Sequence, residues 1–451
     1  MKRFTKMIAY AITLTFSLTV VLSGCGSTPA ASTTTSASTS TAAVTSVATE
    51  TTAAVAKKTV TVWAVDGDYV RRADEKCNAL IKDEIDVQMN YIPNTQYESK
   101  LKVAMSSGDL PDVIGVDSPN LSAYAESGAI VPLDDVWDAA DREDLIDAVK
   151  QGWTYKGQVW GAQHEETNCV LYYNKDMLEK AGLKPAETLE TAWTWQQTID
   201  AAKKLTQKDA NGKTTVYGIL PLMAGPNIAH EGQNYVSNTW TWQAGAEIMD
   251  PEGTTVDGYF NSDKNLNALK LFQQLFVIDK SAPLTEIPNG FQTGKIAMWV
   301  TGPWMISTLK TIPELKWGAM PLPKGERMAS NDGGWGYSVT KKATDKAAAM
   351  KVILAKTGKE GQLIDIIEGG ALPNRKSLFD KAPFLKEYPY PMMLEQLEKT
   401  AKARPTTAAY PTLAIAMQKC FNDVAYGKDP AVAMKEYSAQ MNAALKKANA
   451  N

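Results

Sequence analysis

The chain has 451 residues, of which 44% are hydrophobic and 22% are charged, a balance typical of a soluble globular protein of two or three domains. Its formal net charge is -3 at pH 7, so no overall basic field favours nucleic acid or an anionic lipid surface. The composition therefore argues against a nucleic-acid-binding protein and leaves room for a large hydrophobic core.

The N-terminus has the features of a secretory signal. Basic residues within the first six positions precede an uncharged apolar stretch over residues 7–22, and small residues follow it. This stretch is too short, and too rich in Thr and Ser, to predict a membrane span. The tetrapeptide Leu-Ser-Gly-Cys that ends at Cys25 resembles the bacterial lipobox, in which the cysteine becomes the lipid-modified first residue of the mature protein. We therefore expect a lipoprotein signal peptide over residues 1–24 and a lipid anchor at Cys25.

Residues 25–56 consist mainly of Ser, Thr and Ala, and Glu50 is their one charge. Such a segment holds too little apolar bulk to fold, and we interpret it as a tether, with the folded part beginning near Lys57. The folded part holds Cys77, Cys169 and Cys420. An odd number excludes a closed disulfide framework and the spacing matches no zinc pattern, so we expect isolated buried thiols, with no metal and no cofactor.

From residue 57 onward, patterns typical of strands alternate with patterns typical of helices. Alternating β-branched residues predict the strands, and apolar residues at three- and four-residue spacing predict the helices. Elements that alternate in this way build a mostly parallel sheet covered by helices. The predicted elements are strands over residues 59–65, 85–92 and 111–117, and helices from near residue 69, over 97–105 and over 121–126.

Carboxylates stand at the ends of two of these strands. Asp66 and Asp68 follow the first strand, and Asp117 ends the third. In open α/β sheets, ligands bind in the crevice beyond the carboxyl ends of the strands. Ionised carboxylates there accept hydrogen bonds from neighbouring hydroxyls and interact about twice as strongly as neutral acceptors. We therefore predict that these three residues bind a ligand.

We expect the binding site to be organised around residues 291–304. Apolar residues at helical spacing upstream predict a helix, and the uncharged run over residues 296–300 predicts a buried strand. Gly302 and Pro303 then turn the chain into the next helix, which delivers Trp304 to the end of that strand. The alternative for Trp304 is a core aromatic that closes the helix against the sheet.

A set of short motifs follows in a defined order along the chain. They are Gly-Asp-Leu-Pro-Asp-Val at 108–113, Tyr-Ala-Glu-Ser-Gly at 124–128, Leu-Tyr-Tyr-Asn-Lys-Asp at 171–176, Gly-Lys-Ile-Ala-Met and Gly-Pro-Trp within 291–304, and Leu-Pro-Asn-Arg-Lys at 372–376. Behind a lipobox, this ordered set resembles the extracellular solute-binding proteins of bacterial ABC importers. It is most similar to the sugar-binding family that includes maltose-binding protein. The resemblance covers the chain from residue 57 to the C-terminus.

The resemblance implies an α/β fold of the periplasmic-binding-protein-like kind, type II, in which two lobes joined by hinge strands enclose a ligand cleft. Carried onto this sequence, the N-terminal lobe comprises residues 57–163 plus 338–380. The C-terminal lobe comprises residues 168–335 plus 381–451. Residues 164–167 would form one hinge strand that lines the cleft, and the glycine-rich stretch from residue 333 would form the second.

The resemblance also implies where ligand contacts lie. Tyr235 falls closest to an aromatic of the family's cleft. Trp240 and Trp242 lie two residues apart, so at least one of them is expected to pack in the core. The glycines at 333, 334 and 336 would permit close backbone approach to a ligand or the rotation of a hinge. The predicted ligand-binding residues are Trp304, Asp66, Asp68, Asp117, Glu165, Glu166, Tyr235, Trp240 and Trp335.

Enzymatic chemistry finds little support in the sequence. His164 and His230 are the only histidines, and no nucleophile elbow, zinc-binding helix or phosphate-binding loop is present. The carboxylates could in principle form a glycosidase pair, but Glu165 and Glu166 are adjacent and point to opposite faces of a strand. We therefore favour binding without catalysis.

We predict a substrate-binding lipoprotein that captures a carbohydrate, expected to be an oligosaccharide, and delivers it to the permease subunits of an ABC transporter. It would be a monomer anchored by lipid to the extracytoplasmic face of the cell membrane. Aromatic faces would stack on a sugar ring while carboxylates and amides hold its hydroxyls. The alternatives are a secreted glycan-degrading hydrolase and a sensor subunit that presents a bound solute to a receptor.

Overall fold

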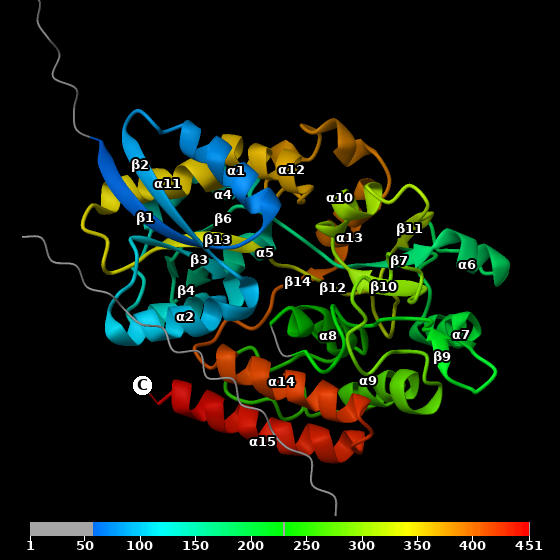
Figure 1. Ribbon diagram of the computed structural model, residues 1–451. Coiled ribbons are helices and arrows are strands. Elements are labelled where there is room, and N and C mark those ends of the chain that lie inside the picture. The colour runs from blue at the N-terminus through cyan, green and yellow to red at the C-terminus, as the bar shows by residue number, and fades with distance from the viewer. Residues whose placement is uncertain (1–56, 229–230, 451) are drawn as a thin grey trace, which may run out of the picture. The chain divides into compact units, whose positions relative to one another are not determined.

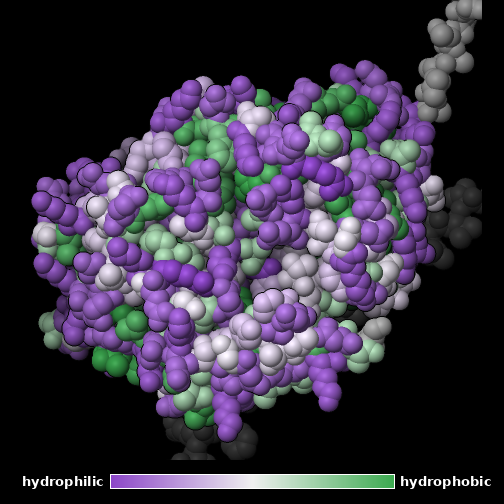
Figure 2. Space-filling model, turned by 180° about the vertical axis from the view of Figure 1, so that it is seen from behind, coloured by the Kyte–Doolittle hydropathy of each residue, from purple (hydrophilic) through white to green (hydrophobic). Residues whose placement is uncertain are grey.

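The computed structural model describes residues 57–228 and 231–450 (Figure 1). The expected signal peptide, lipobox and tether lie outside the described residues, as does His230. Within the described ranges, no helix combines the length and the apolar character needed to cross a membrane. The face seen in Figure 2 is mostly hydrophilic, with hydrophobic groups gathered in several separate places.

The first sheet has five strands in the order β2-β1-β3-β13-β6. Strand β1 is parallel to both β2 and β3, whereas β13 runs antiparallel to β3 and to β6. The expectation of a parallel sheet is therefore confirmed for the first three strands only. Central strand β3 is buried along its whole length, as its uncharged run before Asp117 predicts. The strands are β1 (Lys58–Val65), β2 (Ile85–Ile92), β3 (Val113–Asp117), β6 (Ala162–Gln163) and β13 (Trp335–Val339).

Helices cover both faces of this sheet, with α1, α11 and α12 on one side and α2 on the other (Figure 1). Helix α2 ends at Gly108, which takes the left-handed conformation that favours glycine. The other elements packed around the first sheet are short. The bounds are α1 (Asp68–Ala79), α2 (Asn94–Ser107), η1 (Ser118–Asn120), α3 (Leu121–Glu126), η2 (Asp134–Val136), α4 (Ala139–Asp144), α5 (Asp147–Gly152), β4 (Thr154–Tyr155), β5 (Gln158–Val159), α11 (Lys346–Thr357) and α12 (Lys359–Gly369).

The second sheet has three antiparallel strands in the order β10-β7-β11. The bounds are β7 (Val170–Asn174), β10 (Met298–Thr301) and β11 (Trp317–Met320). The run predicted over 296–300 is thus a strand that begins two residues later than expected. Leu220 pairs with the other side of β10 through an isolated bridge to Trp299, so β10 is hydrogen-bonded on both sides, and Tyr217 bridges Ile296 just before it.

A second core surrounds this sheet, with large aromatic side chains from α8, α9 and α14. Thr194 begins α7 with a reciprocal capping box to Gln197. The remaining bounds are α6 (Lys175–Lys180), α7 (Trp195–Leu205), β8 (Gln207–Lys208), β9 (Thr214–Val216), α8 (Glu231–Gln243), α9 (Asp263–Gln273), η3 (Gln274–Ile278), α10 (Met305–Lys310), β12 (Ser330–Asn331), η4 (Lys376–Leu378), η5 (Pro383–Lys386), α13 (Tyr390–Thr400), β14 (Ala401–Lys402), α14 (Tyr410–Ala425) and α15 (Pro430–Ala448).

Three segments run side by side where the chain passes between the two sheets. Thr167 bridges Gly333, and Glu166 bridges Leu372. The third segment reaches toward both sheets. Leu372 packs with Val170 and Tyr172 of β7, while Arg375 pairs with Asp141 of α4, which lies beside the first sheet. These crossings bring residues that are far apart in the sequence to one place.

Candidate functional site

A cavity of about 280 Å³ opens beside the crossing segments. Its walls come from the ends of β1 and β3, from the crossings, and from α8 and the start of α10. Six of the predicted residues line it: Asp66, Asp117, Glu165, Tyr235, Trp304 and Trp335. His164 and Thr167 of the predicted hinge strand line it too. Residues that the sequence did not single out also line it, among them Tyr69, Asn94, Met223, Tyr337 and Arg404.

Trp304 reaches the cavity through the turn that Gly302 and Pro303 make after β10. A Cβ atom placed on Gly302 would lie 2.0 Å from the Trp304 ring, so the ring folds back over the glycine. The half-buried ring also packs against the second core, and its centroid lies 6.3 Å from that of Tyr235. Trp304 therefore contacts both the core and the cavity. The two alternatives for it, a ligand-binding aromatic and a core aromatic, each describe part of its surroundings.

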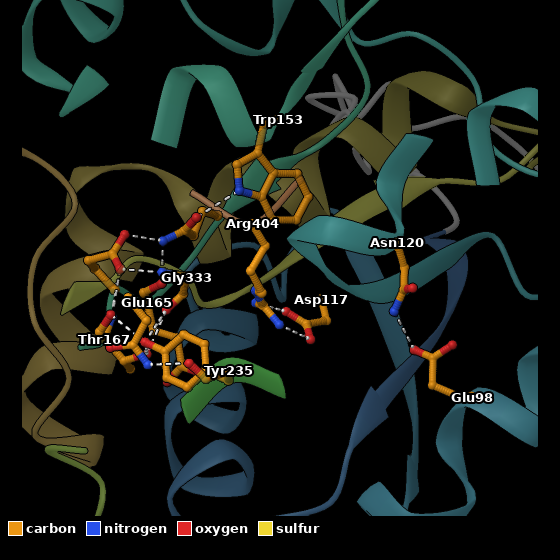
Figure 3. Close-up of polar contacts among 12 residues, drawn as sticks. Glu98, Asp117, Asn120, Trp153, Glu165, Thr167, Tyr235, Gly333 and Arg404 are labelled. Carbon is orange, nitrogen blue, oxygen red and sulfur yellow. Dashed lines mark hydrogen bonds and ion pairs between the residues drawn. The ribbon is translucent and has the colours of Figure 1, made fainter. Parts of the chain in front are cut away.

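Tyr235 projects from α8 toward the crossings. Its hydroxyl donates to the carbonyl oxygen of Thr167 at 2.6 Å and lies 2.8 Å from the Thr167 hydroxyl (Figure 3). The guanidinium of Arg404 lies 5.0 Å from the centroid of its ring. The hydroxyl is thus engaged within the protein, and the ring is what Tyr235 offers to the cavity.

Asp117 carries a partner that the sequence gave no reason to expect. The guanidinium of Arg404 donates to its carboxylate twice, from Nη1 at 3.0 Å and from Nη2 at 2.5 Å (Figure 3). Asp117 is 8% exposed and Arg404 is 6% exposed. Such a bidentate pair is geometrically specific and strongly held. It joins the end of β3 to the segment after β14.

The adjacent residues Glu165 and Glu166 have opposite surroundings, as expected for neighbours in an extended segment. Glu165 faces the cavity, and burial raises the pKa of its carboxyl. Glu166 is fully buried away from the cavity, where it accepts hydrogen bonds from the backbone N–H groups of Thr167 and Gly333 at 2.8 and 3.0 Å. Burial and the nearby Asp332 carboxylate raise its pKa well above the usual range. Glu166 thus holds the crossings together.

Two further predicted residues lie outside the described cavity lining. Asp68 is exposed in the first turn of α1, two residues after Asp66, which lines the cavity. Trp240 is 1% exposed in the second core, stacked on Trp195 with ring centroids 3.3 Å apart. Its neighbour Trp242 is buried as well, because a helix enclosed on several sides buries residues two apart.

The glycines of the second crossing are required by close packing. A Cβ atom on Gly334 would lie 2.0 Å from the carbonyl oxygen of Glu165, and one on Gly336 would lie 2.2 Å from that of Ala162. Gly333 has a φ of 153°, which side chains rarely adopt. Close packing against the protein's own backbone thus accounts for the glycines at 334 and 336, while approach to a ligand and rotation of a hinge stay predictions.

A buried ion pair lies behind the cavity wall. His164 Nδ1 lies 2.7 Å from the Asp365 carboxylate, and both residues are buried. Burial alone would lower the pKa of His164, but the Asp365 carboxylate reverses that effect and raises it to about 9. At neutral pH the imidazole is therefore protonated and paired.

This pair predicts how stability depends on pH. Because the pKa of His164 is higher in the folded chain than its unfolded value of about 6.5, its contribution is complete below that pH and is lost as the pH rises through about 9. We expect the melting temperature to fall over that window, and the free energy of unfolding to fall by less than the one-proton limit of about 1.4 kcal/mol per pH unit. The Asp365→Asn variant should lack this fall, measured by thermal unfolding at several pH values. A fall of the same size in the variant would contradict the assignment.

Comparisons with known proteins agree with this architecture. The family described as bacterial extracellular solute-binding protein matches residues 71–362. The lactose-binding protein of Rhizobium radiobacter is 26% identical over 321 residues, which cover 64% of this chain and 68% of that protein. The maltodextrin-binding protein MdxE of Bacillus subtilis is 25% identical over 308 residues, which cover 65% of this chain and 68% of that protein.

Solved structures share the fold. An ABC substrate-binding protein from Listeria monocytogenes in complex with cycloalternan superimposes with a TM-score of 0.75 at 24% identity, covering 86% of this chain and 99% of that one. A solute-binding protein from Thermotoga lettingae bound with alpha-D-tagatose gives a TM-score of 0.75 at 22% identity, covering 86% of this chain and 100% of that one. The predicted α/β periplasmic-binding-protein fold is therefore confirmed.

Proposed function

Because the chain belongs to the bacterial extracellular solute-binding proteins, which bind solutes and are not enzymes, we propose that it captures a carbohydrate for an ABC importer. The predicted membership of this family is confirmed. Two relatives are named for the sugars that they bind, lactose and maltodextrin, and this supports the choice of ligand class. The permease subunits of the importer are the proposed partners.

The observation that carries the proposal is the composition of the cavity wall. The rings of Trp304, Trp335 and Tyr235 face the same space as the carboxylates of Asp66 and Glu165. Flat aromatic faces pack on the apolar face of a sugar ring, and carboxylates accept hydrogen bonds from its hydroxyls. A volume of about 280 Å³ lies at the lower end of the range for ligand pockets, which favours a short oligosaccharide or a single sugar.

A thermal-shift screen over a carbohydrate panel tests this function directly. A ligand at 100 times its dissociation constant stabilises the folded state by about 2.7 kcal/mol, so a bound sugar should raise the melting temperature measurably. Amino acids and short peptides serve as comparison solutes. A shift with one of those and with no sugar would overturn the carbohydrate assignment while leaving solute binding intact.

We also propose that the two lobes close on the ligand. The lobes are residues 57–163 plus 338–380 and residues 168–335 plus 381–451, and 164–167 and 333–338 are two of the places where the backbone rotates. A ligand favours closure only through its higher affinity for the closed state. Small-angle scattering with and without the sugar found in the screen should show a smaller radius of gyration at saturation. An unchanged radius would mean that the cavity is rigid.

The proposed localisation is the extracytoplasmic face of the cell membrane, through a lipid on Cys25. The motif at Cys25 supports this, and a lipid chain holds a protein at a membrane through its buried methylene groups. We expect the Cys25→Ala protein to leave the membrane fraction when cells are fractionated. A Ser23→Ala variant, which keeps the cysteine, is the control and should stay with the membrane. Membrane retention of the Cys25→Ala protein would contradict the lipid anchor.

A further inference from the structure

The Glu165 carboxylate is the one acidic group of the cavity wall that is both deeply buried and without a cationic partner among the described residues. Glu165 is 5% exposed and faces the cavity. Its side chain receives the Tyr69 hydroxyl at 3.4 Å, which is long for a hydrogen bond to a carboxylate. Its backbone carbonyl is occupied separately by the Gln163 amide.

The buried cations around Glu165 are already matched with other carboxylates. His164 pairs with Asp365 on α12, and Lys356 on α11 pairs with Asp74 on α1. Arg404, which also lines the cavity, pairs with Asp117 in the bidentate contact described above. The partly exposed Asp66 has Arg71 as its partner at 2.8 Å. Each of these cationic side chains is thus paired with a carboxylate other than that of Glu165.

Leaving an ionised carboxylate buried without a counter-charge is costly, and proteins pair or neutralise such groups. Burial is the largest cause that raises the pKa of Glu165, and Asp365 adds to it, while the neighbouring His164 and the Tyr69 hydroxyl act in the opposite direction. A neutral sugar offers only hydroxyl donors to this group. A ligand that brings its own positive charge removes the imbalance.

The rest of the wall suits a cation as well. The aromatic side chains of Tyr69, Trp335 and Tyr337 line the cavity together with Glu165. The face of an aromatic ring attracts an ammonium group, and the attraction is stronger when the pair is removed from water. An ammonium group on a sugar ring can therefore meet both a carboxylate and aromatic faces in this cavity.

We propose that the ligand carries a protonated amine that pairs with Glu165, so that the substrate class is an amino sugar or a short amino-sugar oligosaccharide. This inference rests on the proposed carbohydrate-binding function and narrows it. Asp66 accepts hydrogen bonds from the sugar hydroxyls and the aromatic rings stack on the faces of the sugar, as they would for any sugar. Glu165 discriminates between an amine and a hydroxyl at one position of the sugar ring.

Matched sugar pairs measured by titration calorimetry at pH 7 test the proposal. The probes are glucosamine, glucose and N-acetylglucosamine, and the corresponding disaccharides chitobiose, cellobiose and diacetylchitobiose. In each set the free amine should bind at least tenfold more tightly than the hydroxyl and the acetamide. Equal or tighter binding of the neutral members would overturn the amine proposal and leave carbohydrate binding standing. Failure of every sugar to bind would overturn the proposed function, and the amine proposal with it.

Variants assign the preference to Glu165. The Glu165→Gln protein should lose the tenfold preference for the amine, whereas Glu179→Gln, which makes the same change on the exposed surface of α6, should keep it. Without any ligand, Glu165→Gln should unfold at a higher temperature than the wild type, because the unpaired buried charge is gone. A lower melting temperature, or a preference that survives in Glu165→Gln, would overturn the role given to this residue.

Discussion

Replacing Arg404 by methionine should lower the free energy of unfolding by about 3 to 5 kcal/mol, because removal of one partner leaves a buried charge uncompensated. The carboxylate left behind is that of Asp117, which is 8% exposed and receives two hydrogen bonds from the guanidinium. Methionine keeps much of the length and the apolar stem, so the loss reports the charge and its hydrogen bonds. Urea unfolding, followed by tryptophan fluorescence, measures the change.

A double-mutant cycle separates this pair from the other contacts of Arg404. The Asp117→Leu/Arg404→Met protein should be less destabilised than the sum of the two single variants, because replacement of both charges leaves neither of them unpaired. Lys264→Met is the matched control, since Lys264 and its partner Glu326 are both exposed, and it should lower the free energy of unfolding by less than about 1 kcal/mol. Strictly additive losses in the cycle would show that Asp117 and Arg404 do not stabilise one another.

Trp304→Ala should weaken carbohydrate affinity by about thirtyfold or more, while the protein stays folded. Loss of an aromatic anchor at a binding site typically costs about 2 kcal/mol or more, and 1.4 kcal/mol corresponds to a factor of ten. The ring lines the cavity and contacts the core only in part. Calorimetry with the sugar identified by the screen measures affinity, and thermal unfolding measures the fold.

Two comparison variants sharpen this test. Trp240→Ala should lose stability, by about 3 to 5 kcal/mol, because Trp240 is buried in the core on Trp195. Gly302→Ala should lower the affinity for the sugar by displacing the ring of Trp304 without removing it, since the new methyl group would lie 2.0 Å from that ring. If Trp304→Ala binds normally, Trp304 has no part in the site, and if it unfolds, its role is in the core.

Much of the fold could be predicted because local patterns specify it. The strand over 85–92 and the helix over 121–126 have the predicted bounds, since alternation and amphipathic spacing are properties of the segment itself. The antiparallel pairing of β10 with β7 could not be read from the segment over 296–300. A short apolar run indicates that a strand is buried, but it does not indicate which strands it pairs with or whether the pairing is parallel or antiparallel.

The site shows the same division. Asp66, Asp117 and Trp304 follow strands, so their approach to one crevice could be expected from chain direction. Arg404 could not, because it lies 287 residues from the carboxylate that it pairs with and stands in no recognisable motif. Similarly, the pattern places Glu165 and Glu166 on opposite faces but does not say which face meets the cavity. The place of Tyr69 in the cavity wall could have been predicted, since it follows directly after the acidic stretch at the end of β1.

The place of β13 in the first sheet has a consequence for how the chain is made. This strand lies between β3 and β6, yet it follows the whole of the second sheet in the sequence. While the polypeptide is being synthesised, β3 therefore has an open edge, and the core around the first sheet is incomplete until most of the chain has emerged. Long-range pairing of this kind slows folding, because distant segments must meet before their contacts stabilise them. A newly made chain with this topology stays unfolded for longer, which suits a protein that must be threaded through a membrane before it acquires its shape.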